Sequence, residues 1–534
     1  MLRKEKKRPS LLGGVLLLTV ANLGVKVIGL VFKIPLSHLL GDEGMGYFNA
    51  AYTIYSWLYI ISTAGLPVAV SIMISGAAER EDQKTVDRVF RVAMTAFLLI
   101  GFVGCLLMTL LSAPLSDLIG NRGSRDAIVA VAPTLLFISI VGGLRGYFQG
   151  CKQMLPTAVS QLIEAAGKLV LGILFGRYAA SRGEPLQVVA AYAILGVTIG
   201  TAIGALYLGI LGILDRIRSR TVRSVIPEQR EGGTLAALMK IAIPITVSSA
   251  VMSLTNLIDL GFIMNRLTGA GYSEAEAAAL FGNYTTLVVP MSHLPTVLIY
   301  PIASSIVPYL SSELAKSRRE GAVSLSEAAL RFVSMITLPA AAGLALFGRQ
   351  ILSLFFRSES ARIAAPALAV LAPGIFFLGI VTVTNAILEA NGRAGATVRS
   401  MTLGAVVKTA LAYLLIGNPS FGIYGAAIGT VCCYAVTAII NLIEMRRVVG
   451  RLPSFQAFFA KPLAATGATM LVAVGVCKLT EMYLPPSLHT LLLLALTAAL
   501  YIVFLILFRV FEATDLSRLP FCEKILARLG RIAN

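Results

Sequence analysis

The sequence predicts an all-α polytopic membrane protein, with about fourteen transmembrane helices arranged as two pseudo-symmetric six-helix lobes, two C-terminal helices and a central cavity. Three observations predict this fold class. First, 57% of the 534 residues are hydrophobic and only 13% are charged, whereas a soluble domain has about 25% charged residues. Second, apolar runs of the ~20 residues that a spanning helix needs recur along the whole chain. Third, the second half of the chain repeats residues of the first.

Fourteen segments are apolar enough to span a bilayer. Several exceed ~25 residues, which predicts tilting or extension beyond the bilayer. The first segment follows a basic N-terminus, as in a signal peptide, but it is long, contains two lysines and has no cleavage site, so we interpret it as a retained helix. The predicted spans are 11–40, 46–76, 88–113, 127–149, 156–180, 187–214, 234–267, 278–312, 325–348, 361–390, 396–416, 421–445, 458–483 and 488–511.

Lysine and arginine are concentrated in alternate loops, and this bias predicts the orientation. Cytoplasmic loops of membrane proteins carry the excess of Lys and Arg. The pattern predicts that both termini lie in the cytoplasm, and we expect the chain in a bacterial inner membrane. It also accounts for the formal net charge of +18 without a nucleic-acid partner.

The two halves of the chain resemble each other in sequence. Six residues between Tyr47 and Glu79 have counterparts between Phe281 and Glu313 after a shift of 234 positions. Weak internal symmetry of this kind is typical of transporter folds. The predicted organisation is an N-lobe at 1–214, a basic cytoplasmic linker at 215–233, a C-lobe at 234–446, helices thirteen and fourteen at 447–511, and a cytoplasmic tail at 512–534.

Charged side chains inside the predicted spans are few and mostly basic. They are costly in hydrocarbon and typically face a cavity or a partner, and Lys and Arg suit a phosphate or pyrophosphate group. The predicted substrate-binding residues are Lys26, Arg145, Lys168 and Arg266. Lys26 lies in mid-span, which favours a cavity position, whereas extension of the side chain to the interface is the alternative for Arg145 and Arg266.

Three further charged residues are predicted to couple an ion or to form structural salt bridges: Asp259, Lys408 and Glu164. Asp259 and Lys408 lie at similar depth in their spans, so a static buried ion pair and a pair that responds to the transport cycle are both open. Glu164 lies four residues before Lys168 on one helix, a spacing at which opposite charges can neutralise each other.

Three prolines are predicted gating positions: Pro67, Pro295 and Pro301. Proline in a membrane helix bends it and frees backbone groups, which suits a moving gate. A static kink is the alternative interpretation.

The sequence shows no pattern of a catalytic, metal or nucleotide site. Its six cysteines and three histidines are scattered, without the spacing of a zinc site or a disulfide framework. The glycine-rich segment 41–46 is predicted to be a tight extracellular turn. It is not a phosphate-binding loop, because the Lys-Ser/Thr that such a loop requires does not follow it. We therefore expect no enzymatic activity, no cofactor and no metal, and coupling to Na⁺ or H⁺ stays open.

Several runs together resemble a known family. These are residues 26–37, 40–47, 62–71, 145–150 and 154–164, among which the run Arg-Gly-Tyr-Phe-Gln-Gly followed by Pro-Thr-Ala-Val-Ser-Gln is the most specific. They resemble the polysaccharide biosynthesis branch of the multidrug/oligosaccharidyl-lipid/polysaccharide exporter superfamily. Within that branch the chain is most similar to the group of stage V sporulation protein B and the lipid II flippases.

This resemblance implies a flippase that moves an undecaprenyl-pyrophosphate-linked sugar, with lipid II as the leading candidate, to the outer leaflet by alternating access. It implies that Lys26 and Arg266 contact the pyrophosphate and that Asp259 occupies the acidic position of a sodium site, while Lys408 departs from the family pattern. It also implies a role in peptidoglycan or spore cortex synthesis, beside cell-wall enzymes as partners. The alternatives are a cation-coupled multidrug antiporter of the same superfamily and an exporter of another lipid-linked polysaccharide intermediate.

Overall fold

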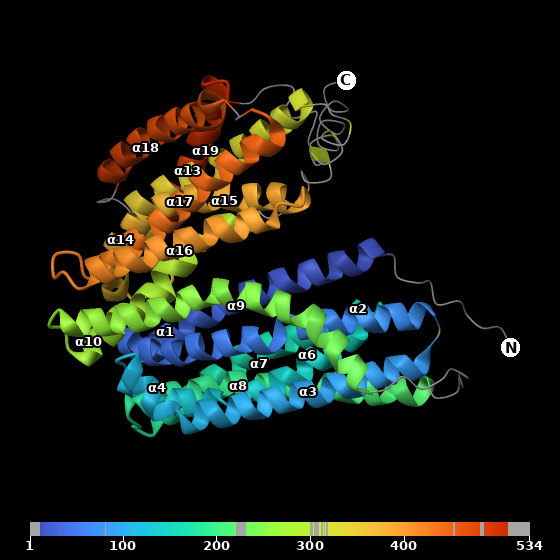
Figure 1. Ribbon diagram of the computed structural model, residues 1–534. Helices are drawn as coiled ribbons and strands as arrows, with labels where there is room; N and C mark the ends of the chain where they lie inside the picture. Colours follow the sequence, from blue (N-terminus) through green and yellow to red (C-terminus); the bar gives the residue numbers. More distant parts are fainter. Residues whose placement is uncertain are drawn as a thin grey trace. The chain divides into compact units, whose positions relative to one another are not determined.

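The computed structural model describes residues 11–80, 82–219, 231–299, 303, 309–310, 313, 316, 319–451, 454–480 and 485–510. The described chain is helical and contains no β-strand in those ranges, so the predicted all-α class is confirmed (Figure 1). In the same ranges, eleven helical stretches are long and apolar enough to cross a membrane. The chain is a multi-pass membrane protein, and the number fourteen stays a prediction.

The chain divides into two compact units, Met1–Gly282 and Asn283–Asn534. The boundary lies after helix α9 (Glu231–Gly269) because α9 packs against α1, α2 and α3 of the first unit. The predicted lobes follow the sequence duplication instead and assign the same helix to the C-lobe. That layout stays a prediction.

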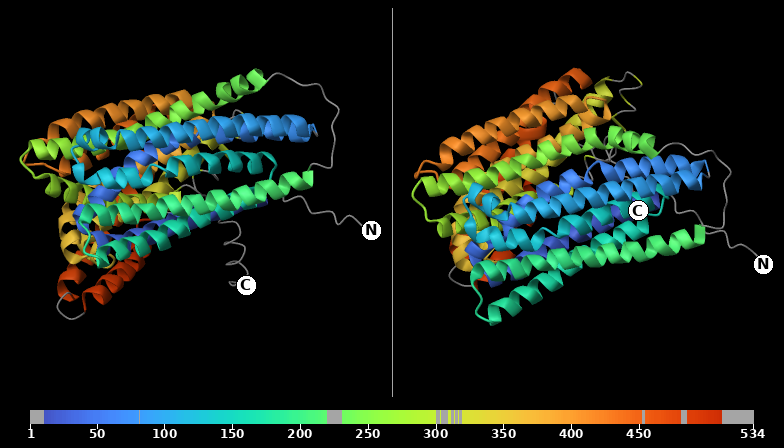
Figure 2. Two further views of the ribbon diagram at one scale, coloured as in Figure 1. Left: turned by 90° about the horizontal axis from the view of Figure 1, so that it is seen from below. Right: turned by 60° about the horizontal axis from the view of Figure 1, so that its bottom comes forward.

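The first unit is a bundle of long helices that run alongside one another in Figures 1 and 2. Its described elements, besides α9, are α1 (Leu11–Thr63), α2 (Leu66–Glu79), α3 (Gln83–Leu110), α4 (Ser112–Leu118), η1 (Arg122–Ser124), α5 (Arg125–Val131), α6 (Thr134–Gly150), α7 (Met154–Ser181), α8 (Leu186–Ser219) and α10 (Glu274–Asn283).

Helix α1 reverses direction at Gly41. Gly41 has φ of 65° and ψ of −175°, a conformation that residues with a Cβ rarely adopt. In one straight helix Phe32 and Phe48 would lie ~24 Å apart along the axis, yet their ring centroids are 5.9 Å apart. The two halves of α1 therefore lie side by side as a hairpin. The sequence predicted a turn over residues 41–46, whereas in the structure the single residue Gly41 makes the turn.

The second predicted span, 46–76, is interrupted. Helix α1 ends at Thr63 and α2 begins at Leu66, with Pro67 in its first turn, where proline fits a helix. A Cβ at Gly65 would collide with the backbone oxygen of Ala242 on α9. The interruption thus lies where another helix approaches the backbone too closely for a side chain.

Helices α7 and α8 pack backbone to backbone through glycines. Gly196, Gly200 and Gly204 repeat every four residues on α8, which is the small-residue spacing of close membrane helix pairs. A Cβ at Gly196 would overlap the backbone of Gly172, and one at Gly167 would lie 2.6 Å from the Cα of Gly200. We call this line of close glycine contacts the seam. It holds α7, with its polar residues, directly against α8.

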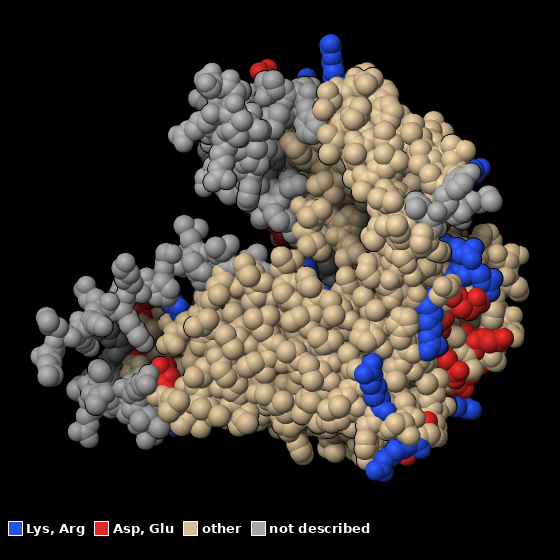
Figure 3. Space-filling view, turned by 180° about the vertical axis from the view of Figure 1, so that it is seen from behind, with Lys and Arg blue, Asp and Glu red and all other residues tan. Residues whose placement is uncertain are grey.

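The outer surface of the first unit is apolar over most of its height. In the lower part of Figure 3, charged side chains gather towards the ends of the helices and leave an uncharged band between them. Large hydrophobic side chains are exposed on this unit, including Leu110, Leu118 and Leu206 at 68%, 72% and 64% exposure. Such exposure is stable in lipid and would be costly in water.

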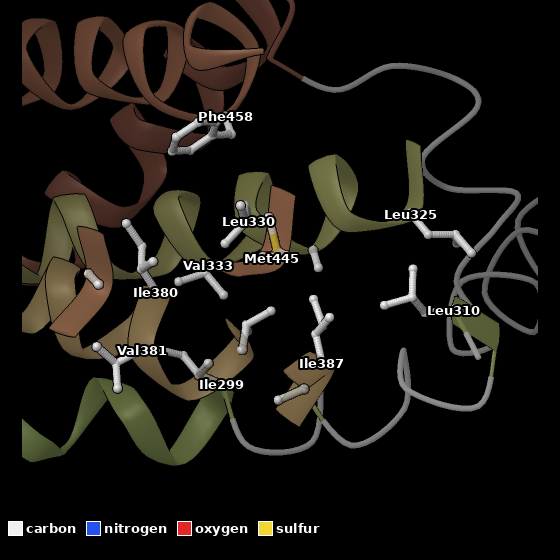
Figure 4. Close-up of a cluster of buried hydrophobic side chains, with 14 of the residues drawn as sticks. Ile299, Leu310, Leu325, Leu330, Val333, Ile380, Val381, Ile387, Met445 and Phe458 are labelled. Atoms are coloured by element: carbon white, nitrogen blue, oxygen red, sulfur yellow. The ribbon is translucent and has the colours of Figure 1, made fainter. Parts of the chain in front are cut away.

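The second unit contains the remaining described elements and has its own core. Figure 4 shows a cluster of buried hydrophobic side chains in that core, where Leu330 and Val333 meet Ile380, Ile387 and Met445. The elements are η2 (Tyr284–Val288), α11 (Val289–His293), η3 (Pro295–Leu298), α13 (Arg319–Ser353), α14 (Ser358–Leu371), α15 (Pro373–Ala390), α16 (Ala394–Ile416), α17 (Tyr424–Val449), η4 (Gln456–Ala460), α18 (Lys461–Thr480) and α19 (Pro486–Leu507).

Candidate functional site

One face of α7 carries a line of polar and charged residues through the first unit. Ser160, Glu164 and Lys168 follow each other at four-residue spacing, and residues four apart lie on the same side of a helix. The close glycine seam between α7 and α8 fixes this face relative to its neighbours. The three side chains therefore point towards a common region, which α6 and α1 complete.

Arg145 of α6 binds the first two of these residues. Its Nε donates a hydrogen bond to Ser160 Oγ at 3.0 Å, and its Nη2 lies 3.0 Å from Glu164 Oε1. The side chains of Arg145 and Glu164 are only 12% and 19% exposed. This ion pair joins two helices, so among the described contacts Glu164 is neutralised by Arg145, and the predicted neutralisation by Lys168 is not what the structure shows.

Lys168 lies against aromatic rings. Its Nζ is 4.2 Å from the ring centroid of Tyr52 and 5.2 Å from that of Phe32. An ammonium group this close to ring faces is stabilised by their electron density, more so where water is excluded. The two rings come from opposite halves of the α1 hairpin, so the reversal at Gly41 builds the position of Lys168.

The rings belong to an aromatic ladder along α1. Phe48, Tyr52, Tyr55 and Tyr59 follow at spacings of four, three and four residues, which places them on one face of the helix. Consecutive ring centroids are 6.1, 5.7 and 6.0 Å apart, and Phe32 extends the series to the first half of α1. The ladder begins beside Lys168, whose Nζ lies against Tyr52 and Phe32.

Lys33, the second lysine of the first predicted span, also belongs to this site, although its place near the outer end of that span favoured extension of its side chain to the interface. It is half-buried on α1 and directly follows Phe32, whose ring centroid is 5.2 Å from Lys168 Nζ. Spacing in the sequence gave no signal for this arrangement, because residues of α1 approach Lys168 only when α1 packs against α7. We name Lys33, Lys168, Arg145 and Glu164, with the aromatic ladder, the first-unit cluster.

The remaining predicted residues lie elsewhere. Lys26 is exposed on α1, Asp259 and Arg266 are half-buried on α9, and Lys408 is half-buried on α16 of the second unit. The pairing of Asp259 with Lys408, and the contacts of Lys26 and Arg266 with substrate, stay predictions.

Two of the three predicted gating prolines are described. Pro67 lies in the first turn of α2, directly after the interruption at 64–65. Pro295 begins the short η3 helix, which follows the π-helix η2 and the five-residue α11. Pro301 lies outside the described residues. Both described prolines therefore adjoin breaks in regular helix, and movement at those breaks stays a prediction.

The second unit contains an ion pair that the sequence analysis overlooked. Arg331 is 3% exposed, and its Nη2 lies 2.9 Å from Oε1 of Glu327, four residues earlier on α13. Both residues fall inside the predicted span 325–348, so the rule that draws attention to charges in spans could have found them. Within the described ranges, no three His, Cys, Asp or Glu side chains gather as ligands for a metal ion.

Two of the relatives found by comparison with known proteins are similar over most of their length. Stage V sporulation protein B of Bacillus subtilis (strain 168) is 23% identical over 529 residues, which cover 98% of this chain and 100% of that protein. Lipid II flippase MurJ of the same organism is 25% identical over 460 residues, which cover 82% of this chain and 83% of that protein.

Solved structures show the same fold. Lipid II flippase MurJ in an inward closed conformation superposes with a TM-score of 0.68 at 15% identity, over 92% of this chain and 99% of that one. An inward-facing multidrug resistance MATE family transporter of the MOP superfamily gives a TM-score of 0.66 at 18% identity, over 81% of this chain and 98% of that one.

The relatives and structures whose names state an activity are flippases and transporters and not enzymes. The model of a family described as polysaccharide biosynthesis protein matches residues 11–314, more than half of the sequence. The chain therefore belongs to the polysaccharide biosynthesis protein family and has the fold of the MOP-superfamily transporters.

Proposed function

We propose that this protein flips an undecaprenyl-pyrophosphate-linked sugar precursor, with lipid II as the leading candidate, from the inner to the outer leaflet by alternating access. The observation that supports this most directly is the position of the Lys168 ammonium group, whose Nζ is 4.2 Å from the ring centroid of Tyr52 and 5.2 Å from that of Phe32, the residue before Lys33. Two lysines in one part of the helix bundle favour an anionic ligand, because each can form a charge-assisted hydrogen bond with a pyrophosphate oxygen.

The surroundings of the two lysines suit the rest of such a substrate. The aromatic ladder offers apolar faces with hydroxyl groups at their edges, which can contact a sugar through both kinds of surface. Arg145 is already bound by Ser160 and Glu164, so we assign it the role of positioning α7 and not that of a primary phosphate ligand. Lys26 is the third cation that we expect to contact the substrate.

The balance of charge argues against the multidrug antiporter. A cation-coupled exporter of cationic drugs needs carboxylates that bind protons, sodium or drug. The first-unit cluster has three cations and one carboxylate, and Arg145 neutralises that carboxylate. A role in peptidoglycan or spore cortex synthesis, with cell-wall enzymes nearby, belongs to this proposal and rests on the kinship with the sporulation protein and the flippase.

The test is flipping of lipid II in cells depleted of their own flippase, scored by whether an externally added agent reaches the precursor. We expect the wild type to restore flipping, and Lys168→Gln, Lys33→Gln and Lys26→Ala to reduce it by at least about tenfold, which corresponds to the loss of one charge-assisted contact. Lys84→Gln is the matched control, because Lys84 is exposed on α3 outside the cluster.

Two outcomes would contradict the proposal in different ways. If the folded wild type in the membrane fails to restore flipping, lipid II is not the substrate, and other lipid-linked glycans are the next to assay. If the wild type works and all three lysine variants work equally well, the substrate does not bind at these lysines.

A further inference from the structure

A pocket of about 440 Å³ lies in the second unit, where α13 begins and α17 ends. Three arginines line it, Arg319, Arg331 and Arg451, together with two glutamates, Glu320 and Glu327. These five side chains carry a formal charge of +1. The proposed transport path makes no use of this pocket.

The glutamate deepest in the pocket is already engaged. Glu327 Oε1 lies 2.9 Å from Nη2 of the buried Arg331, and its Oε2 accepts a hydrogen bond of 3.1 Å from the backbone N–H of Ser454. This carboxylate therefore fixes the floor of the pocket. The charges that face the opening are those of Arg319, Arg451 and Glu320, which are all exposed.

Gly450 ends α17 beside Arg319. Its φ of +100° is a conformation that favours glycine. A Cβ at this position would lie in ordinary van der Waals contact with Arg319, 3.5 Å from its Cδ and 3.9 Å from its Nη1. The backbone turn at Gly450 therefore lies next to Arg319, and Arg451, one residue beyond Gly450, lines the same pocket.

Apolar aromatic residues adjoin the basic rim. Phe455 lies four residues after Arg451 and is 64% exposed, and its ring centroid is 4.8 Å from that of Phe459 and 5.8 Å from that of Phe458. Exposed aromatic side chains next to basic residues at the end of a spanning helix are typical of the level of lipid headgroups.

The orientation predicted from the basic loops puts this end of α13 on the cytoplasmic side. Basic pockets between membrane helices on that side bind anionic headgroups. The guanidinium fork is also suited to the oxygens of a phosphate.

We propose that this pocket binds the phosphate of an anionic phospholipid, with Arg319 and Arg451 as its ligands and the lipid chain against Phe455. The pocket is separate from the first-unit cluster, so the proposal goes beyond the transported substrate. It gives the second unit a site that responds to the lipid composition of the inner leaflet.

The experiment is a binding titration of the purified full-length protein in a neutral detergent with short-chain phosphatidylglycerol, phosphatidylcholine or inorganic phosphate. We expect phosphatidylglycerol to bind more tightly than the other two. The double variant Arg319→Gln/Arg451→Gln weakens its binding at least about tenfold, as the loss of charge-assisted contacts predicts. Arg446→Gln is the matched control, because Arg446 is exposed on α17 near the same end but does not line the pocket.

Both substituted arginines are exposed, so we expect the variants to fold, and the unfolding temperature without lipid checks this. Unchanged phosphatidylglycerol binding in the folded double variant would overturn the proposal. Equal affinity for inorganic phosphate would show an anion pocket without lipid specificity and would overturn the assignment to a phospholipid. Neither result depends on whether the protein flips lipid II.

Discussion

Arg145 connects two helices through a single guanidinium group. Its side chain and that of its partner Glu164 are only 12% and 19% exposed. Removing one member of a buried ion pair leaves the other charge uncompensated, at a cost of about 3–5 kcal/mol. We expect Glu164→Gln and Arg145→Gln each to lower the free energy of unfolding by about 3 kcal/mol. The double variant should lose less than the sum of the two, as thermal or denaturant unfolding of the purified protein would show.

The exposed pair of Lys152 and Glu79 is the control for that cycle. Its Nζ and Oε1 atoms are 2.9 Å apart, close to the 3.0 Å of the buried pair, but the side chains are 63% and 65% exposed. Lys152→Gln should leave the unfolding midpoint unchanged, because water screens exposed ion pairs. Strictly additive effects of the two buried substitutions would show that Arg145 and Glu164 act on stability separately.

The residues of the first-unit cluster were only partly predictable from sequence. Charge within an apolar span indicated Arg145, Glu164 and Lys168, because such charges are rare and costly. Spacing along one helix suggested Lys168 as the partner of Glu164, while the structure joins Glu164 to a residue nineteen positions away. Partners on other helices depend on packing, which local spacing does not describe.

The seam between α7 and α8 depends on the absence of side chains at a few positions. Gly196→Ala would place a Cβ into the backbone of Gly172, and overpacking of this kind costs about 1–3 kcal/mol. We expect this variant to unfold at a lower temperature than the wild type, with a smaller monodisperse fraction after purification. Gly209→Ala on the same helix is the control, because a Cβ there meets nothing within 4 Å.

Gly209→Ala should be neutral or slightly stabilising, since alanine favours helix more than glycine does. Equal losses in both variants would mean that α8 tolerates no alanine for reasons unrelated to the seam. The repeat Gly196-x3-Gly200-x3-Gly204 was visible in the sequence and would have predicted the close pair. Pro67 indicated a bend near the interruption at 64–65, whereas the close approach of α9 to Gly65 had no signal in the sequence.

The orientation of the whole molecule can be measured at two short loops. Glu184, between α7 and α8, is exposed on the side predicted to be outside, and Gln153, between α6 and α7, is exposed on the side predicted to be inside. In intact cells a membrane-impermeant maleimide should label Glu184→Cys, and it should label Gln153→Cys only after the membrane is opened.

The wild type measures the background of that experiment. Burial, together with the charge of Asp215, raises the pKa of Cys151 to about 11, so its thiol stays protonated at neutral pH and reacts slowly. Labelling of Gln153→Cys in intact cells would show that the orientation is the opposite of the predicted one. The phospholipid pocket would then lie on the outer side of the membrane.

At the scale of the whole molecule, composition and hydrophobic run length were sufficient for the fold class, because a bilayer permits few other structures for such a chain. The division of the chain was not predictable in the same way. The duplication starts a second half at α9, while packing places α9 in the first compact unit. The sequence repeat shows which segments of the two halves correspond, whereas the compact units show which helices pack together.

The one-residue turn at Gly41 has a consequence for biosynthesis. The two halves of α1 are joined at Gly41 without a hydrophilic loop, so we expect the segments 11–40 and 42–63 to enter the bilayer together as a hairpin. In the predicted orientation, the neighbouring Asp42 and Glu43 then cross the bilayer in one step, and the combined hydrophobicity of both arms offsets the cost of moving their charges. A polar insertion at Gly41 would uncouple the arms, and the first would have to commit to the membrane before the second had been synthesised.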